Sequence, residues 1–325
     1  MHIVIASNVQ LPALEYGGTE RIMWWLGKEL VRKGHQVSFL VKPGSSCDFA
    51  RVISYNPAQS LQSQLPADAD LVHTHFVTHE QVNIPQVTTI HGNEPIGLSL
   101  PLNSVFVSKN HAERHGSQVF VYNGLDFSDY GEPALNEKRL YYHFLGKAAW
   151  RLKNVRGAIA LANACSEKLR VIGGYRLNIK MGFRFTPNLN VKFMGMLGGE
   201  KKNQVLRKSK GLIFPVLWHE PFGIAIIESL YFGCPVFGTP YGSLPELVPP
   251  AVGFLSANKE ELIEQIKHAA FDAETCHQYA VQNFSSSKMA EEYFKLYQQV
   301  LNGENLNQKA PARLQDQKSK FLPFD

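Results

Sequence analysis

Short runs rich in Val, Ile and Phe alternate with amphipathic segments along the whole chain. Such runs are typical of parallel strands buried on both faces, and the segments between them are typical of the helices that cover a sheet. Both halves of the chain show the pattern. The sequence therefore predicts an α/β protein with two open sheets, and the carboxyl ends of their strands are where such sheets bind ligands.

In the first half, the pattern predicts one long helix from Thr19, a good N-cap, to Lys33, and Gly34 closes it. The expected strands of this half are His2–Ser7, Gln36–Val41, Asp70–His73, Gln86–Ile90, Ser104–Val107 and Val119–Tyr122.

A second series begins near Leu140, after the polar stretch Ser128–Arg139, which predicts a linker. The stretch Gly173–Asn190 fits no strand and helix pair. The expected strands are Tyr141–Leu145, Lys168–Ile172, Val191–Met194, Gly211–Phe214, Pro235–Gly238 and Val252–Leu255. The expected helices are Val155–Ala164, Gln204–Ser209, Gly223–Phe232 and Lys259–Phe271.

These elements predict an N-terminal domain over residues 1–135 and a C-terminal domain over residues 136–286. An amphipathic helix, Lys288–Leu301 within residues 287–302, is expected to cross back to the first domain. Residues 303–325 form a polar tail in which apolar periodicity stops, and we expect this tail to be solvated.

Composition narrows the class of protein. Of the 325 residues, 44% are hydrophobic and 19% are charged, which is the balance of a folded globular chain. The formal charge of +5 suits a phosphate-bearing ligand and leaves peripheral contact with the inner membrane surface open. The sequence has no block of basic residues and no aromatic-interleaved basic stripe, so nucleic-acid binding receives little support.

The four cysteines are far apart and form no C-x-x-C pair, which argues against a disulfide framework or a structural zinc site. No stretch reaches about 18 apolar residues, and the N-terminus lacks a basic leader. We therefore expect a cytoplasmic protein.

Two glutamates, Glu220 and Glu228, stand eight positions apart in the segment Trp218–Gly242, WHEPFGIAIIESLYFGCPVFGTPYG. Eight residues are about two helical turns. A helix that starts at the Pro-Phe-Gly step has Glu220 on the loop before it and Glu228 in its second turn. Backbone amides at a helix N-terminus favour a phosphate, and here they belong to Phe222, Gly223 and Ile224. By itself, such a pair of glutamates is ordinary.

The whole string, from the first acid through Pro-Phe-Gly and the second acid to Gly-Cys-Pro-Val, resembles the Glu-x7-Glu signature of glycosyltransferase family 4. That family consists of retaining, nucleotide-sugar-dependent enzymes with the GT-B architecture, two Rossmann-like domains facing each other across a cleft. The resemblance implies an acceptor side in the N-terminal domain and a donor side in the C-terminal domain. It further implies that Glu220 contacts the transferred sugar, that Glu228 holds the ribose, and that the amides of residues 222–224 face the sugar and diphosphate.

Further matches follow the same order as in the family. Phe144-Leu145-Gly146-Lys147 followed by Lys153 resembles the segment in which an Arg and a Lys six residues apart grip the donor diphosphate. Lys147 stands where Arg is usual and lacks the planar fork of a guanidinium. Without the other motifs, two ordinary surface lysines are the simpler interpretation.

In the first domain, Glu15-Tyr16-Gly17-Gly18-Thr19 lies between a predicted strand and a predicted helix, as a phosphate-binding loop does. The resemblance implies that Gly17 and Gly18 contact the diphosphate or the acceptor. It also implies that the imidazole of His91, which stands before Gly92 at a strand end, lies beside the donor sugar near the reacting carbon. A plain tight turn and a core histidine are the alternatives.

His73 and His75 share one face of a predicted strand, a spacing that also suits a metal site. No third ligand stands at a recognisable spacing, so we expect no metal and no other cofactor.

Together these features predict a retaining glycosyltransferase with Glu220 and His91 as its catalytic residues. The expected donor is a UDP-sugar, with GDP-mannose next, and the expected acceptor is a glycan, a glycolipid or a small molecule. The expected pathway is synthesis of cell-surface polysaccharide, lipopolysaccharide or glycolipid. Alanine at Glu220 or Lys153 is expected to abolish turnover and leave the fold intact. The alternatives are a non-catalytic nucleotide-sugar or glycan binding protein on the same fold and a sugar-nucleotide epimerase.

Overall fold

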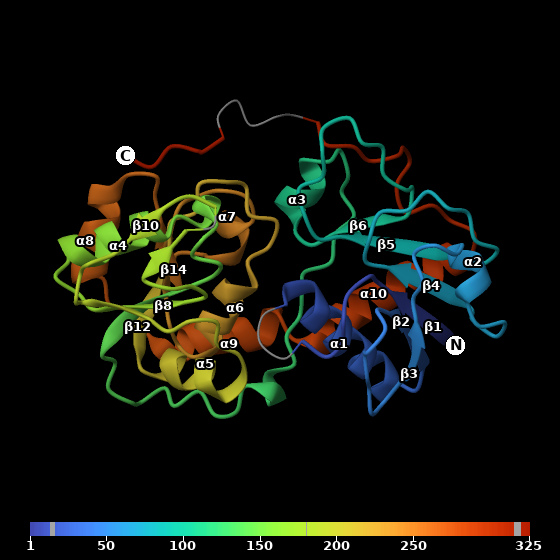
Figure 1. The fold of residues 1–325 in the computed structure, drawn as a ribbon, viewed down its shortest axis with the longest axis horizontal. Coiled ribbons are helices and arrows are strands. Elements are labelled where there is room, and N and C mark those ends of the chain that lie inside the picture. Colours follow the sequence, from blue (N-terminus) through green and yellow to red (C-terminus); the bar gives the residue numbers. More distant parts are fainter. Residues whose placement is uncertain (14–16, 180, 315–319) are drawn as a thin grey trace. The chain divides into compact units, whose positions relative to one another are not determined.

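The computed structural model describes residues 1–13, 17–179, 181–314 and 320–325. The chain divides into two compact units. The first consists of Met1–Asp126 and Phe284–Asp316, and the second of Phe127–Asn283 and Gln317–Asp325. Each unit contains a six-stranded parallel sheet with helices packed against it (Figure 1). The predicted α/β class with two open sheets is confirmed.

In the first unit, β1 (His2–Ala6) lies inside a sheet of order β3-β2-β1-β4-β5-β6. All five β1 residues are buried because strands pair with both of its edges and side chains cover both of its faces. The other strands are β2 (Gln36–Val41), β3 (Arg51–Ser54), β4 (Leu71–Thr74), β5 (Gln86–Ile90) and β6 (Ser104–Phe106), and the helices are α1 (Gly18–Arg32), α2 (Leu61–Gln64), α3 (Lys109–Glu113) and α10 (Ser286–Leu301).

Helix α10 is far from α1 in sequence, yet the two helices pack side by side (Figure 1). The hydroxyl of its buried Tyr297 forms a hydrogen bond of 2.7 Å with His73 Nδ1. The hydroxyl of its buried Tyr293 forms one of 2.7 Å with Thr89 Oγ1. This late segment of the chain therefore completes the core of the first unit.

In the second unit, β7 (Tyr141–Leu145) lies inside a sheet of order β11-β8-β7-β12-β13-β14. The remaining strands are β8 (Leu169–Ile172), β11 (Val191–Phe193), β12 (Ser209–Phe214), β13 (Val236–Gly238) and β14 (Gly253–Leu255), with β9 (Leu177–Asn178) and β10 (Arg184–Phe185) forming a separate antiparallel hairpin. The helices are α4 (Val155–Ala164), α5 (Gly199–Arg207), α6 (Ile224–Tyr231), α7 (Leu244–Leu247), α8 (Lys259–His268) and α9 (Ala273–Asn283), with short 3₁₀ turns η1 (Phe127–Asp129) and η2 (Arg151–Lys153).

Three predictions about the elements were wrong. The strand expected at Val119–Tyr122 is reduced to one bridge, between Phe106 and Phe120. Thr19 does not cap α1, whose N-cap is Gly17. The helix expected to reach Ser209 ends at Arg207, since Ser209 already pairs with β7 as the first residue of β12.

Strand β3 and helix α9 are among the elements that were not predicted. Strand β3 is an edge strand without a fully buried residue, so it carries no apolar run that a sequence pattern could reveal. Helix α9 buries only Cys276 and Ala280, which gives a weak helical periodicity.

The stretch predicted as a linker is packed in place. The units divide at Asp126 and Phe127, ahead of the expected boundary at residue 135. Tyr130 is buried and donates a hydrogen bond to the carboxylate of Glu228 at 2.8 Å.

The predicted tail is mostly exposed among its described residues, but parts of it are packed. In the first unit, Asn307 is buried and its side chain donates to the backbone oxygens of Leu102 and Ser104. In the second unit, Phe324 packs against the core, and the backbone of Asp325 bonds to that of Lys259. Polar residues dominate the tail, but the side chains of Asn307 and Phe324 and the backbone of Asp325 attach parts of it to the two units.

None of the helices that the structure describes is both long and apolar enough to cross a bilayer.

Replacing Phe324 with Ala should lower the free energy of unfolding by about 2 kcal/mol, since the ring leaves a partly buried site in the second core. Urea denaturation followed by circular dichroism measures this. Leu189→Ala is the control, because the Leu189 side chain is 92% exposed. Equal stability of the two variants would show that the tail does not contribute to the core.

Candidate functional site

The ten candidate residues fall into two groups, one in each unit. The first unit carries Gly17, Gly18 and His91. The second unit carries Lys147, Lys153, Glu220, Phe222, Gly223, Ile224 and Glu228.

In the second unit, Lys153 and Glu220 form a buried ion pair. Lys153 ends the 3₁₀ turn that follows β7, and Glu220 lies on the loop that follows β12. The Lys153 Nζ and Glu220 Oε2 atoms are 2.5 Å apart, and the two side chains are 10% and 7% exposed. Because β7 and β12 are adjacent and the strand order reverses between them, the pair lies at the point where open sheets bind ligands.

Aromatic rings surround this ion pair. The Lys153 Nζ lies 5.8 Å from the ring centre of Trp150, 5.2 Å from that of Phe214 and 5.3 Å from that of Trp218. The indole N–H of Trp218 also donates to Glu220 Oε2 at 2.9 Å. Cation–π contacts and low solvent exposure strengthen the electrostatic coupling of the pair.

The position of Glu220 depends on Gly242. Gly242 has φ +66°, and a Cβ atom added to it would lie 2.2 Å from the Glu220 backbone nitrogen. The next residue, Ser243, donates its backbone N–H to the backbone carbonyl oxygen of Glu220 at 2.9 Å. Only glycine therefore allows the loop after β13 to pack against the loop that carries Glu220.

Helix α6 begins directly after this loop, which confirms the predicted helix start. Its N-cap is Gly223, with φ +93°, a conformation that favours glycine. Phe222 is buried, and its carbonyl accepts a hydrogen bond from the Ser243 hydroxyl at 2.5 Å. The helix N-terminus that includes Ile224 thus lies on the same loop as Glu220, and its positive end favours a negatively charged group.

Glu228 belongs to a second buried ion pair, separate from the first. Its carboxylate accepts hydrogen bonds from the Lys202 ammonium on α5 and from the Tyr130 hydroxyl. Both glutamates are buried, at 6% and 2% exposure, so neither is a solvated helix acid.

Lys147 differs from Lys153 in its surroundings. It lies on the turn after β7, where its carbonyl accepts a hydrogen bond from Trp150, and its side chain is exposed. An exposed ammonium is free of the desolvation cost that Lys153 bears.

In the first unit, His91 follows β5 and pairs with His75, which follows β4. The Nδ1 atom of His75 lies 2.7 Å from Nε2 of His91. Burial lowers the pKa of His91 to about 4, and burial together with the neighbouring histidines holds the pKa of His75 well below its usual range. The two rings are therefore neutral at neutral pH, and one donates to the other.

His73 is a core residue. Its two ring nitrogens lie 2.7 Å from the Tyr297 hydroxyl and 2.7 Å from the Thr89 hydroxyl, and burial lowers its pKa to about 3. In the part of the chain that the structure describes, no three His, Cys, Asp or Glu residues are grouped so as to hold a metal ion.

Gly17 is the N-cap of α1, and Gly18 is its first residue. Glu15 and Tyr16, the other residues predicted for this loop, lie outside the described residues. The Gly17 carbonyl accepts a hydrogen bond from the Arg21 side chain at 3.1 Å.

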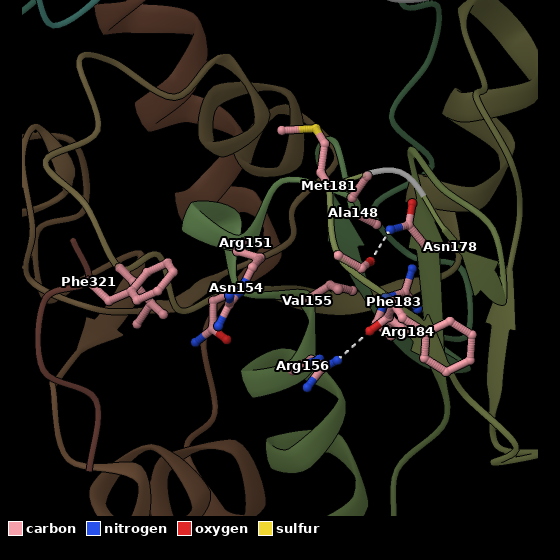
Figure 2. Close-up of a pocket in the computed structure, with 13 residues that line it drawn as sticks. Ala148, Arg151, Asn154, Val155, Arg156, Asn178, Met181, Phe183, Arg184 and Phe321 are labelled. Carbon is pink, nitrogen blue, oxygen red and sulfur yellow. Dashed lines mark hydrogen bonds between the residues drawn. The ribbon is translucent and has the colours of Figure 1, made fainter.

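A cavity of about 340 Å³ lies in the second unit, and its lining includes Ala148, Asn154 and Leu217, the chain neighbours of Lys147, Lys153 and Trp218. Figure 2 shows Met181 and Asn178 of the β9–β10 hairpin on one side of it and Phe321 of the C-terminal segment on the other. Arg151 and Arg156 also line it, but none of the ten candidate residues does.

A comparison with known families finds a match in the second unit. Residues 131–284 match the family model described as Glycosyl transferases group 1. The matched residues lie almost entirely within the second unit. They include both buried ion pairs and the N-terminus of α6. No curated protein sequence matches the chain.

Solved structures show that the chain has the GT-B fold over more than nine tenths of its length. AviGT4, a glycosyltransferase involved in Avilamycin A biosynthesis, has a TM-score of 0.77 at 19% identity over 93% of this chain and 98% of its own. Sucrose-phosphate synthase from Thermosynechococcus elongatus has a TM-score of 0.68 at 17% identity over 93% and 100%. Anabaena HepE, solved with UDP and glucose, has a TM-score of 0.63 at 15% identity over 91% and 98%.

In the second unit, the partners of the two glutamates were not predicted from the sequence. Lys202 stands three and four positions before the buried Val205 and Leu206, so helical spacing places it on the buried face of α5. That signal was available in the sequence. The role of Tyr130 was not, because it lies in a polar stretch without periodicity.

The Lys153–Glu220 pair changes the expectation that alanine variants keep the fold intact. Replacing Glu220 with Gln should leave the Lys153 charge buried without its counterion and lower the free energy of unfolding by about 3 kcal/mol. The double variant Glu220→Gln/Lys153→Met should recover much of the loss. A double-mutant cycle in urea measures the coupling, and additive losses would show that the two side chains do not depend on each other.

Acid should destabilise the protein before most carboxylates titrate. The unfolded chain binds protons on His73 and His91 below pH about 6.5, whereas the folded pKa values are about 3 and about 4. The free energy of unfolding should therefore fall by about 1.4 kcal/mol per pH unit for each histidine as pH drops from about 6.5 towards 4.

Urea denaturation at pH 7 and pH 5 measures this loss. The variant His91→Gln should lose less stability between these two pH values than the wild-type protein. His79 is exposed, so the variant His79→Gln is the control and should lose as much stability between pH 7 and pH 5 as the wild-type protein. A loss in His91→Gln as large as in the wild type would contradict the assignment.

Proposed function

We propose that the chain is a retaining glycosyltransferase of family 4. It transfers a sugar from a nucleoside-diphosphate sugar to a glycan, glycolipid or small-molecule acceptor. A UDP-sugar is the favoured donor and GDP-mannose is next. The Anabaena HepE structures with UDP and with UDP-glucose, on the same fold, support a nucleotide-sugar donor. WaaG, a glycosyltransferase involved in lipopolysaccharide biosynthesis that shares the fold, supports a role in surface polysaccharide or glycolipid synthesis.

One observation carries the proposal. In a domain that matches the group 1 family, Lys153 and Glu220 are in contact at the carboxyl ends of β7 and β12, next to the N-terminus of α6. A cation, an acid and a helix N-terminus at one point can hold a diphosphate and a sugar hydroxyl together.

The main chemical difficulty of the reaction is the negative charge of the leaving diphosphate. An ammonium group has three N–H donors, so Lys153 can bond to Glu220 and to a phosphate oxygen at the same time. Lys147 and the amides of residues 222–224, which act as fixed dipoles, stabilise the rest of that negative charge without a metal ion.

In the proposed reaction, the bond between the anomeric carbon and the β-phosphate oxygen breaks, and a bond to the acceptor oxygen forms on the same face. The acceptor's proton moves to the leaving phosphate oxygen. Glu220 accepts hydrogen bonds from the sugar hydroxyls, and Glu228 accepts them from the ribose. His91 contacts the transferred sugar through a neutral ring whose orientation depends on the hydrogen bond with His75.

A donor panel tests the proposal. The folded protein should melt at a higher temperature with one class among UDP-, GDP-, ADP- and TDP-sugars. With that donor and a set of acceptors, free nucleoside diphosphate should be released, and added chelator should leave the rate unchanged.

The variants Glu220→Gln, Lys153→Met and the double variant should each lose about 100-fold or more in turnover. Because the double variant removes both charges of the pair, it leaves no unpaired buried charge. A loss of turnover in this variant is therefore not caused by a loss of stability. Glu264→Gln and Lys138→Met, at exposed positions, are the matched controls. Donor binding without release of nucleoside diphosphate would favour a binding protein on the same fold, and wild-type turnover in the double variant would refute the assignment.

A further inference from the structure

The β9–β10 hairpin and its flanks carry an unusual concentration of exposed apolar side chains. Of the thirteen large apolar side chains that are exposed among the described residues, seven lie between positions 175 and 189. Ile179 is 75% exposed, Phe183 70% and Leu189 92%. The other four are Tyr175, Leu177, Met181 and Phe185. We call these seven side chains the apolar face.

Two arginines hold the hairpin from its inner side. Along each strand, apolar residues at odd positions are exposed, and the residues between them are more buried. Arg184 is buried and donates to the Tyr175 carbonyl at 2.9 Å, while Arg176 donates to the carbonyls of Thr186, Asn188 and Val191. These internal hydrogen bonds fix the apolar residues on the outside, so their exposure is a built feature of the hairpin.

The segment of sequence that carries the apolar face has charges of one sign. Between Glu167 and Glu200 the sequence has no acidic residue and six basic ones, Lys168, Arg170, Arg176, Lys180, Arg184 and Lys192. Arg176 and Arg184 bond inward, whereas Lys168 and Lys192 are exposed. A surface that combines apolar side chains with basic ones matches a bilayer with anionic headgroups.

The cavity beside the hairpin adds to this surface. Figure 2 shows Met181 and Phe183 of the hairpin together with Arg151 and Arg156 around it. Arg151 and Arg156 are exposed, and Arg156 also donates to the Phe183 carbonyl at 2.8 Å. Guanidinium groups next to apolar side chains suit a lipid phosphate above its acyl chains.

We propose that the apolar face inserts into an anionic membrane surface, with Arg151 and Arg156 against lipid phosphates. A second copy of the chain fits less well, because a two-fold contact through this region would bring the basic residues of both copies together. This proposal concerns attachment alone and does not depend on the transfer reaction.

Vesicle co-sedimentation of the full chain tests the proposal. One set of vesicles is phosphatidylcholine alone, and in the other about a third of the lipid is phosphatidylglycerol. The wild type should bind the anionic vesicles at least about tenfold more tightly than the neutral ones. In a Phe183→Trp variant, indole emission should shift to the blue on binding only if this position enters the bilayer.

The triple variant Ile179→Ser/Met181→Ser/Phe183→Ser should lose about tenfold or more in binding to anionic vesicles. Its matched control, Ile96→Ser/Leu140→Ser/Leu314→Ser, also removes three exposed apolar side chains and should bind like the wild type. Thermal melting checks that both variants are folded.

The proposal would be overturned if the triple variant of Ile179, Met181 and Phe183 bound anionic vesicles as tightly as the wild type. It would also be overturned if the wild type did not bind anionic vesicles. A wild-type dimer that the hairpin substitutions convert to a monomer without any binding to vesicles would overturn it too, since the occupant of the apolar face would then be a second copy.

Discussion

The buried contact between Lys153 and Glu220 is the constraint on which the second unit is organised. Two opposite charges removed from water must stay together, because separating them would leave each one buried without a counterion. Three aromatic rings enclose the ammonium, Trp218 donates to the carboxylate, and Gly242 allows a neighbouring loop to pack against Glu220. The same features hold a cation and an acid at the carboxyl ends of β7 and β12, where an open sheet binds its ligand.

Both units bury charged pairs as well as neutral hydrogen-bonded groups. The second unit buries charged pairs, Lys153 with Glu220 and Lys202 with Glu228. The first unit buries Glu29 against Arg32 and Asp126 against Lys28. It also buries a hydrogen-bonded chain that joins His73 to Thr89 and to two tyrosines of α10. Burial keeps His73 and His91 of the first unit and His143 of the second unit uncharged, so stability in acid depends on both units.

The β9–β10 hairpin departs from the usual arrangement of polar and apolar residues. In the rest of the second unit, apolar side chains fill the core, whereas in the hairpin the arginines bond to backbone carbonyls and the apolar side chains face outward. This hairpin follows β8 in the stretch that sequence patterns could not interpret. An outward apolar face lowers the free energy only where something less polar than water covers it.

The sequence by itself determined the α/β class, most strands of both sheets and the start of α6, because strands buried on both faces must be continuously apolar and a helix start needs its own local residues. Its motifs also selected Glu220 and Lys153 as members of one site. Only the tertiary structure decided their partners: Tyr130 and Lys202 at Glu228, Trp218 at Glu220, and His75 at His91. It also decided that parts of the polar tail pack against the two units and that seven apolar side chains between positions 175 and 189 are exposed to solvent. Such contacts join residues far apart in the chain, and no local pattern of polarity encodes which distant side chain will neutralise a buried charge.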